Sequence, residues 1–316
     1  MNALITGAGL VGSQIAHLEQ AAGRRPVLFD IAPRAESIRD FVDLDRCALM
    51  RGDLGSPLAL IEAIRKHDVA TIIHTAAYPG LTVGGLADPL GTVQVNILGT
   101  VHVLEAARIM GVQRVVLCSS SAIYTYAGGE DAGGEGMEEA YPRPMSLYAT
   151  TKQASEDLGL NYARTYGIDV VCVRFSSVFG PWRSGGGGIA TVQMESMLRS
   201  TLAGSPVTVE RPRREWVYSK DAALGTHLAA TVEAANLKDR VFNIGMGVSI
   251  GGEEMAVALN ALGTGAEITV VEPPAGSYLT TDRPPMDATR AREQLGFVPQ
   301  YLTDRAISDY ADWMRS

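Results

Sequence analysis

The chain has 316 residues, of which 46% are hydrophobic and 20% charged, and its formal net charge is −8. This apolar content is enough for a large core, either in one domain or in a domain with a smaller lobe. The acidic balance argues against a nucleic-acid partner, because phosphate backbones require clustered lysines and arginines. No apolar run is long enough for a membrane span, and the first expected strand starts near Asn2. We therefore expect a cytoplasmic protein without a membrane anchor or a signal peptide.

Short apolar runs alternate with longer helical patterns along the first part of the chain. The expected strands are residues 3–6, 26–30, 71–77, 114–120 and 169–175. Helical patterns lie between them, for example over residues 93–110. Nearly continuous apolar strands separated by helices indicate a parallel sheet covered on both faces. This pattern predicts a doubly wound α/β fold, the Rossmann fold.

The pattern changes after residue 180. The glycine-rich residues 184–188 are followed by an expected helix over 191–204 and a strand over 206–210. A strand over 240–245 is expected to return to the main sheet. The predicted Rossmann domain comprises residues 1–180 and about 215–246, and the predicted substrate-binding lobe comprises about 181–214 and 247–316.

Three glycines follow the first expected strand in a G-x-G-x-x-G pattern, at positions 7, 9 and 12. Gly7 permits the tight turn, Gly9 lets the backbone approach a pyrophosphate, and Gly12 lets the helix and the strand pack closely. The start of the following helix offers N–H groups and a positive dipole end to phosphates. The pattern predicts a dinucleotide site that includes Leu10 and Val11 in the same turn.

Asp30 ends the second expected strand. A carboxylate at this distance from the glycines accepts hydrogen bonds from an adenosine ribose. It would also repel a 2′-phosphate, so Asp30 favours NAD over NADP as the cofactor. The alternative interpretation is that Asp30 only forms a turn at the end of the strand.

Tyr148 and Lys152 are four residues apart in an expected helix, so both side chains lie on one face. A phenol is a poor base at neutral pH, but a neighbouring ammonium group stabilises the phenolate. A serine cluster at residues 119–121 ends an expected parallel strand, and ligands of doubly wound folds bind at the carboxyl ends of the strands. These residues predict an acid/base site next to the dinucleotide.

Several stretches together resemble the extended short-chain dehydrogenase/reductases, the NAD-dependent epimerase/dehydratase family. The likeness runs in family order along nearly the whole chain. The matching stretches are the glycine turn, Asp30, "GDL" (52–54), "HTAA" (74–77), "VNILGT" (95–100), "SSSAIY" (119–124), "YATTK" (148–152), "RFSSVFGP" (174–181), "REWVYSKD" (214–221), "FNIG" (242–245) and "LGFVPQ" (295–300). The resemblance implies an NAD-dependent oxidoreductase of carbohydrate metabolism.

The resemblance also implies roles for individual residues. Tyr148 would be the catalytic acid/base, and Lys152 would lower its pKa and hold the nicotinamide ribose. Counting back from Tyr124 assigns the catalytic hydroxyl to Ser120, with Ser121 as the open alternative. By the same likeness the cofactor would be contacted by Asp53, Leu54, Ala76, Ala77 and Asn96. The family often forms homodimers through helices that would here span residues 95–110 and 148–166.

The chain departs from the family where the substrate would bind. Sugar 4,6-dehydratases carry an Asp-Glu pair directly after the catalytic hydroxyl, whereas this chain has Ser121 and Ala122, so we do not expect a dehydratase. Ser177 replaces an asparagine that is usual in sugar-nucleotide enzymes. Arg183, Arg213 and Arg214 are candidates to bind an anion, because guanidinium groups suit carboxylates and phosphates. The resemblance favours Arg214, which matches the substrate arginine of the family. We expect an anionic small-molecule substrate, a carboxylated or phosphorylated polyol.

These residues support three functional hypotheses. A dehydrogenase would oxidise a secondary hydroxyl and release the ketone, and this is the hypothesis that we favour. An epimerase with tightly held NAD would use the same groups on a sugar nucleotide. A non-catalytic NAD-binding sensor is the third hypothesis, although a sensor does not need the Tyr148–Lys152 pair. The five histidines show no metal-ligand spacing, so we assign no metal.

Overall fold

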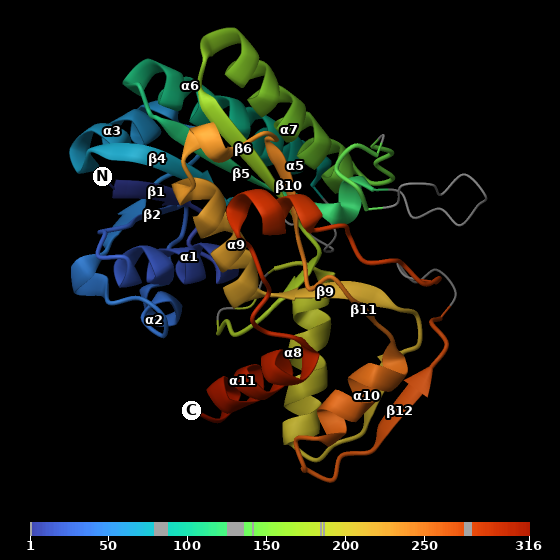
Figure 1. Ribbon diagram of the computed structural model, residues 1–316. Helices are drawn as coiled ribbons and strands as arrows, with labels where there is room; N and C mark the ends of the chain where they lie inside the picture. The colour runs from blue at the N-terminus through green and yellow to red at the C-terminus, as the bar shows by residue number, and fades with distance from the viewer. Residues whose placement is uncertain are drawn as a thin grey trace.

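The computed structural model describes residues 2–78, 88–124, 136–140, 142–183, 185, 187–274 and 280–316. A seven-stranded sheet lies at its centre, with the strand order β10-β6-β5-β4-β1-β2-β3 (Figure 1). All neighbouring strands in it are parallel. The strands are β1 (Asn2–Thr6), β2 (Val27–Asp30), β3 (Ala48–Arg51), β4 (Val69–His74), β5 (Arg114–Ser120), β6 (Asp169–Phe175) and β10 (Val241–Ile244). The predicted doubly wound α/β fold is confirmed.

Helices cover both faces of this sheet (Figure 1). Successive residues of β1 point to opposite faces, so that Ile5 packs in one apolar core and Leu4 in the other. The first core includes Ile15 of one helix and Ala222 of another, and the second includes Leu104. The helices are α1 (Leu10–Ala21) and α9 (Ser219–Thr231) on the first face, and α3 (Pro57–His67), α6 (Gly99–Met110) and α7 (Leu147–Tyr166) on the second. Short helices α2 (Ala35–Ile38) and α5 (Pro89–Val93) and a π-helical turn (Gln94–Leu98) complete this part.

A smaller lobe extends beyond the carboxyl ends of the strands (Figure 1). It contains α8 (Ile189–Leu202), β8 (Val207–Glu210), α10 (Gly252–Asn260), β12 (Ile268–Val271) and α11 (Thr303–Arg315). β8 and β12 form a two-stranded parallel sheet. The lobe has its own apolar core, in which Met194, Leu259 and Tyr310 are buried.

A three-stranded sheet lies between the main sheet and the lobe. It has the order β11-β9-β7 and consists of β7 (Ser177–Phe179), β9 (Arg214–Tyr218) and β11 (Ser249–Ile250). The predicted domain boundaries near residues 181 and 215 therefore pass through this sheet. The predicted return of residues 240–245 to the main sheet is confirmed, because β10 pairs with β6.

In the part of the chain that the structure describes, no helix has both the length and the apolar character needed to cross a membrane.

Candidate functional site

The glycine turn connects β1 to α1 and begins the site. Gly7 has a φ of +89°, and its N–H donates to the carbonyl oxygen of Phe29 at 2.8 Å. A Cβ on Gly12 would lie 1.9 Å from the carbonyl oxygen of Gly7, so the turn and α1 pack too closely for any side chain there. At Gly9, by contrast, a Cβ would have no other described atom within 4 Å. The open side of the turn is therefore at Gly9, where the backbone begins α1.

Asp30 lies at the end of β2 beside this turn. Its Oδ2 accepts a hydrogen bond from the N–H of Ala8 at 2.8 Å, and its Oδ1 accepts one from Ala32 at 2.8 Å. Asp30 thus holds the glycine turn in place as well as facing the cleft described next. A carboxylate has further lone pairs, so these two bonds leave it able to accept a hydrogen bond from a ribose hydroxyl.

A cleft of about 630 Å³ runs along the carboxyl ends of the strands. It brings together most of the residues expected from the sequence. Those that line it are Gly7, Gly9, Leu10, Val11, Gly12, Asp30, Asp53, Leu54, Ala76, Ala77, Ser120, Ser121, Tyr148, Lys152, Ser177 and Arg214. Asn96 and Arg183 are not among the lining residues.

Tyr148 and Lys152 come from the first turns of α7. The hydroxyl of Ser146 caps this helix by accepting from the N–H of Ala149 at 3.1 Å. The Nζ of Lys152 lies 5.8 Å from the centre of the Tyr148 ring and donates to the carbonyl oxygen of Cys118 at 2.8 Å. Burial lowers the pKa of Lys152. The carbonyl bond fixes the ammonium group beside the ring, on the same helix face.

The serine cluster ends β5 in the same cleft. The Oγ of Ser120 accepts from the N–H of Ala122 at 3.1 Å, which leaves its own proton available to a ligand. Ser121 also lines the cleft, so the choice between the two hydroxyls stays open. The buried hydroxyls of Ser119 and Ser176 line the cleft too and have no hydrogen-bond partner among the described residues. Buried polar groups are normally paired, so these two fit a cleft that receives a polar ligand such as a dinucleotide.

Asn96 lies behind the cleft, in the π-helical turn. Its Oδ1 accepts from the N–H of Tyr78 at 2.7 Å, and its Nδ2 donates to the hydroxyl of Thr151 at 2.9 Å. Tyr78 lines the cleft, and Thr151 precedes Lys152. The structure therefore places Asn96 where it supports cleft residues from behind.

The three arginines near the predicted substrate region have different environments. The Nε of Arg183 donates to Asp40 at 2.6 Å, and the Arg213 guanidinium pairs with Glu254 and with the Ser249 carbonyl. Arg214 instead lines the cleft, and its Nη2 donates to the Oε1 of Gln193 at 2.7 Å. Of the three, Arg214 is the one that the structure brings to Tyr148 and the glycine turn.

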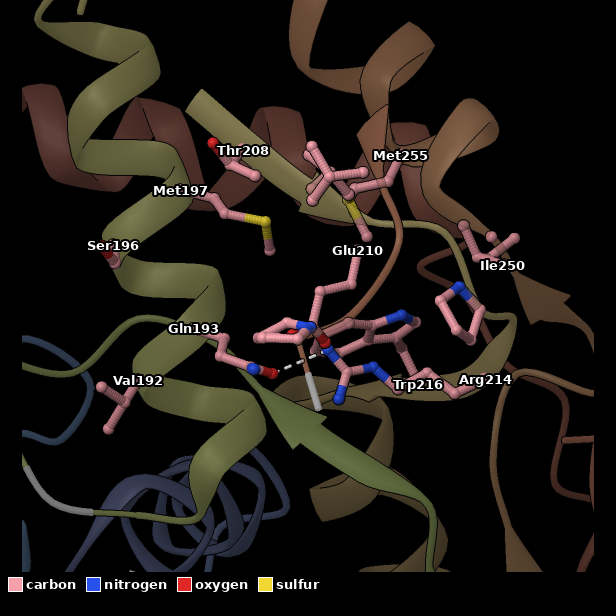
Figure 2. Close-up of a pocket in the computed structure, with 15 residues that line it drawn as sticks. Val192, Gln193, Ser196, Met197, Thr208, Glu210, Arg214, Trp216, Ile250 and Met255 are labelled. Atoms are coloured by element: carbon pink, nitrogen blue, oxygen red, sulfur yellow. Dashed lines mark hydrogen bonds between the residues drawn. The ribbon is translucent and has the colours of Figure 1, made fainter. Parts of the chain in front are cut away.

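Arg214 also borders a second pocket of about 500 Å³ in the lobe (Figure 2). Its guanidinium carbon lies 4.2 Å from the centre of the Trp216 ring. Figure 2 shows Gln193 on α8 pointing toward Arg214, with Met197 and Met255 above them. The remaining lining residues are mostly apolar: Val192, Val209, Pro212, Ile250, Val271 and Pro274, with Ser196, Thr208, Glu210 and Gly251. Because Arg214 belongs to both pockets, the second pocket adjoins the cleft.

Sequence reasoning missed Arg283, which also lines the cleft. Its N–H donates to the carbonyl oxygen of Arg213 at 2.9 Å, and this bond brings it close to Arg214. Arg283 lies in an irregular stretch far from Arg214 in the sequence, and no periodic pattern indicates this contact. The cleft therefore has two arginines, from β9 and from the segment after β12.

Glu215, next to Arg214, is a buried carboxyl group. It accepts from the N–H of Gly247 at 2.6 Å and of Met286 at 3.1 Å. Burial raises its pKa to about 7 in spite of these bonds. Glu215 therefore links three segments of the lobe region through hydrogen bonds. Its carboxyl group changes charge near neutral pH.

We expect Glu215 to make the stability of the protein fall as the pH rises. Its pKa is higher in the folded state than in the unfolded state, so its stabilising contribution is complete below about pH 4.3 and is lost as the pH rises through about 7. The contribution of Glu215 to the free energy of unfolding is roughly 2–4 kcal/mol. Melting temperatures between pH 5 and 8.5 should therefore fall less steeply in Glu215→Gln than in the wild type.

The slope of melting temperature against pH is the quantity to compare. The glutamine amide at position 215 can raise or lower stability by the same amount at every pH, and such a constant shift leaves the slope unchanged. Glu267→Gln, at an exposed position of the same lobe, is the control and should follow the wild-type slope. If the curves of melting temperature against pH were parallel for Glu215→Gln and the wild type, Glu215 would not be the group that causes the pH dependence.

Within the described ranges, no three histidine, cysteine, aspartate or glutamate side chains are grouped so that they could hold a metal ion.

Comparison with known proteins places this geometry among related chains. Residues 3–245 match the model of a family described as "NAD dependent epimerase/dehydratase family". The chain is 29% identical to a dTDP-glucose 4,6-dehydratase of Streptomyces antibioticus, across 100% of this chain and 92% of that protein. It is 28% identical to a UDP-glucose 4-epimerase of Mycolicibacterium smegmatis, across 100% of this chain and 99% of that protein.

The fold is also similar to a solved structure, that of the Thermus thermophilus UDP-glucose 4-epimerase in complex with NAD. The TM-score is 0.83 and the identity 28%, and the match covers 100% of this chain and 99% of that chain.

Proposed function

Because this chain belongs to the NAD-dependent epimerase/dehydratase family, we propose that it oxidises a secondary hydroxyl of an anionic, sugar-like or polyol substrate. The resemblance predicted from the motifs is confirmed, and the chain is an NAD-dependent enzyme of the extended short-chain dehydrogenase/reductase type. One observation carries the proposal: a single cleft is lined by the glycine turn and by Tyr148, Lys152 and the serine cluster. A non-catalytic sensor would not need this combination.

Each catalytic group has a defined task in this proposal. Lys152 stabilises the phenolate form of Tyr148 from the same helix face, and this phenolate takes the proton of the substrate hydroxyl and becomes the neutral phenol. Ser120 or Ser121 donates a hydrogen bond to the substrate oxygen as its negative charge develops. NAD, when bound, supplies the hydride acceptor.

The arginines support an anionic substrate. Arg214 and Arg283 line the same cleft as Tyr148, and guanidinium groups bind carboxylates and phosphates through paired N–H donors. Ser177 also lines this cleft and offers a hydroxyl. An anion held by these groups would keep its neighbouring hydroxyl near Tyr148.

The second pocket favours an alternative substrate, a sugar nucleotide, and with it an epimerase. The pocket adjoins the cleft at Arg214 and has a volume of about 500 Å³, within the usual range for a small-molecule site. Its apolar walls and Trp216 suit a flat ring. Under this alternative the ketone stays in the cleft and receives the hydride back on its other face.

A dehydratase activity is not part of the proposal. Elimination of water requires an acid and a base next to the oxidised carbon. Residues 121 and 122, which follow the Ser120 hydroxyl, are serine and alanine and carry no carboxylate.

We also propose a homodimer formed by the helices on the second face of the sheet. Leu98 is 47% exposed before α6, Ile109 is 56% exposed near its end, and Tyr166 is 53% exposed on α7. Apolar side chains exposed together on neighbouring helices favour association.

Native mass spectrometry of the protein, purified without added cofactor, tests both the cofactor and the assembly. A dimer that releases NAD or NADH in near-stoichiometric amount on denaturation would favour the epimerase, because that enzyme must keep its cofactor. A dimer without nucleotide that binds NAD reversibly is the expected result for the dehydrogenase. Polyols and sugar acids are then screened for NADH formation. A monomer would contradict the proposed dimer, and failure to bind NAD would contradict the proposed function.

A further inference from the structure

Aromatic side chains from three separate parts of the chain stack beside the cleft. Phe41 follows α2, Trp182 follows β7, and Trp313 lies on α11 near the end of the chain. The Phe41 ring centre is 6.4 Å from that of Trp182 and 6.2 Å from that of Trp313, with interplanar angles of 17° and 19°. Phe41 therefore makes offset stacks with both tryptophans.

The residues next to this stack form an ion pair in the same place. Arg183 adjoins Trp182 and Asp40 adjoins Phe41, and the Nε of Arg183 donates to Asp40 at 2.6 Å. The Arg183 guanidinium carbon also lies 4.6 Å from the centre of the Trp313 ring. These five residues, Asp40, Phe41, Trp182, Arg183 and Trp313, are called the clasp below.

The clasp joins the Rossmann part to the lobe. The carbonyl oxygen of Phe41 is hydrogen-bonded to Nδ1 of His17 at 2.8 Å, which attaches it to α1. Trp313 belongs to α11, which packs against α8 and α10 in the lobe (Figure 1). Lobes of one chain move relative to each other unless their interface is large and apolar, so a contact of this kind restricts their opening.

The clasp also touches the wall of the cleft. Trp182 lines the cleft and is only 7% exposed, and Gly187, Ile189 and Thr191 line it as well. The glycine turn lines the same cleft from the start of α1. The wall that contains Trp182 and the glycine turn therefore face each other across the cleft in which the dinucleotide is proposed to bind.

We infer that the clasp holds the cleft wall closed over the bound dinucleotide and sets the rate at which NAD or NADH leaves. The inference rests on the proposed function, since it takes NAD to bind at the glycine turn. Arg183 thereby acts as a positioning residue of the wall, at a place where the guanidinium faces Asp40 and Trp313 and not the cleft. Loss of the clasp should speed dissociation far more than it changes association, because most effects of contact mutations appear in the dissociation rate.

The test is the dissociation rate of NADH, measured by stopped flow as excess NAD displaces it and its fluorescence changes. We expect Phe41→Ala and Arg183→Gln each to release NADH about tenfold faster than the wild type, as expected for loss of a stacked aromatic or cation–π contact. Phe41→Leu keeps apolar volume and is the second variant if the alanine variant does not fold. Arg199→Gln is the matched control, because it removes another exposed arginine that pairs with an acid, Glu195, in the lobe.

The outcomes separate the two proposals. Wild-type release rates in folded Phe41 and Arg183 variants would overturn the clasp, even if their melting temperatures fell, because the contacts would then serve the fold alone. Faster release in Arg199→Gln as well would also overturn it, since the effect would not be specific to the clasp. A wild-type protein that binds no NADH would overturn the proposed function, and the clasp with it.

Discussion

Tyr148→Phe should lose most turnover, by about 10²–10⁴-fold, while it still binds NAD. The substitution removes one hydroxyl oxygen and leaves the ring in place beside the Nζ of Lys152. Without that hydroxyl the proton of the substrate has no positioned acceptor, whereas the glycine turn is unchanged. The rate of NADH formation at saturating substrate and the NADH dissociation constant are the two measurements.

Tyr166→Phe is the control for this experiment. Tyr166 lies at the other end of α7 and is 53% exposed, so the loss of its hydroxyl should leave both measurements at their wild-type values. If Tyr148→Phe retained most of its turnover, another group would have to be the base and the proposed mechanism would be wrong.

Gly12→Ala is expected to have the largest effect on the fold near the cofactor. Its Cβ would stand 1.9 Å from the carbonyl oxygen of Gly7, so the turn or α1 must move. A forced backbone shift in a close-packed region costs roughly 1–3 kcal/mol in free energy of unfolding. We expect a lower melting temperature without cofactor, together with a loss of NADH binding.

Gly9→Ala is the matched comparison, because it adds the same methyl group three residues away. No other described atom lies within 4 Å of that Cβ, and the backbone at Gly9 is in an extended conformation that alanine adopts. The methyl group would enter the cleft where the pyrophosphate is expected, so NADH affinity should fall while the melting temperature without cofactor stays near the wild-type value. If this variant bound NADH as tightly as the wild type, the phosphates would not approach Gly9 and the proposed cofactor position would be wrong.

The strands of the central sheet were predictable because they are continuous apolar runs. The expected strands at residues 114–120 and 169–175 coincide with β5 and β6, whereas the run at 71–77 forms β4 over Val69–His74. β3 and β9 are among the elements that were missed. β3 is a short edge strand whose residues are only partly buried, so its sequence lacks a strong apolar signal. β9 falls in the predicted Rossmann domain, but its pairing with β7 joins distant parts of the chain that no local pattern connects.

Some residues of the candidate site were likewise predictable from the sequence, and others were not. Tyr148 and Lys152 were predictable as a pair because four residues make about one helical turn and place both side chains on one face. The environments of the arginines were not predictable from the sequence. Arg183 and Arg214 are both arginines near the substrate region, but the first meets Asp40 and the second meets Gln193 at the cleft.

The sequence by itself determined the glycine turn, the Tyr-Lys spacing and the positions of most of the central strands. These features follow from local geometry: the turn needs glycine, the helix repeats about every 3.6 residues, and a buried strand must be apolar. Only the tertiary structure decided which charged groups face the cleft, that Arg283 lines it together with Arg214, and that Phe41 stacks with both Trp182 and Trp313. Those contacts join residues far apart in the chain, and they depend on how the lobe packs against the sheet.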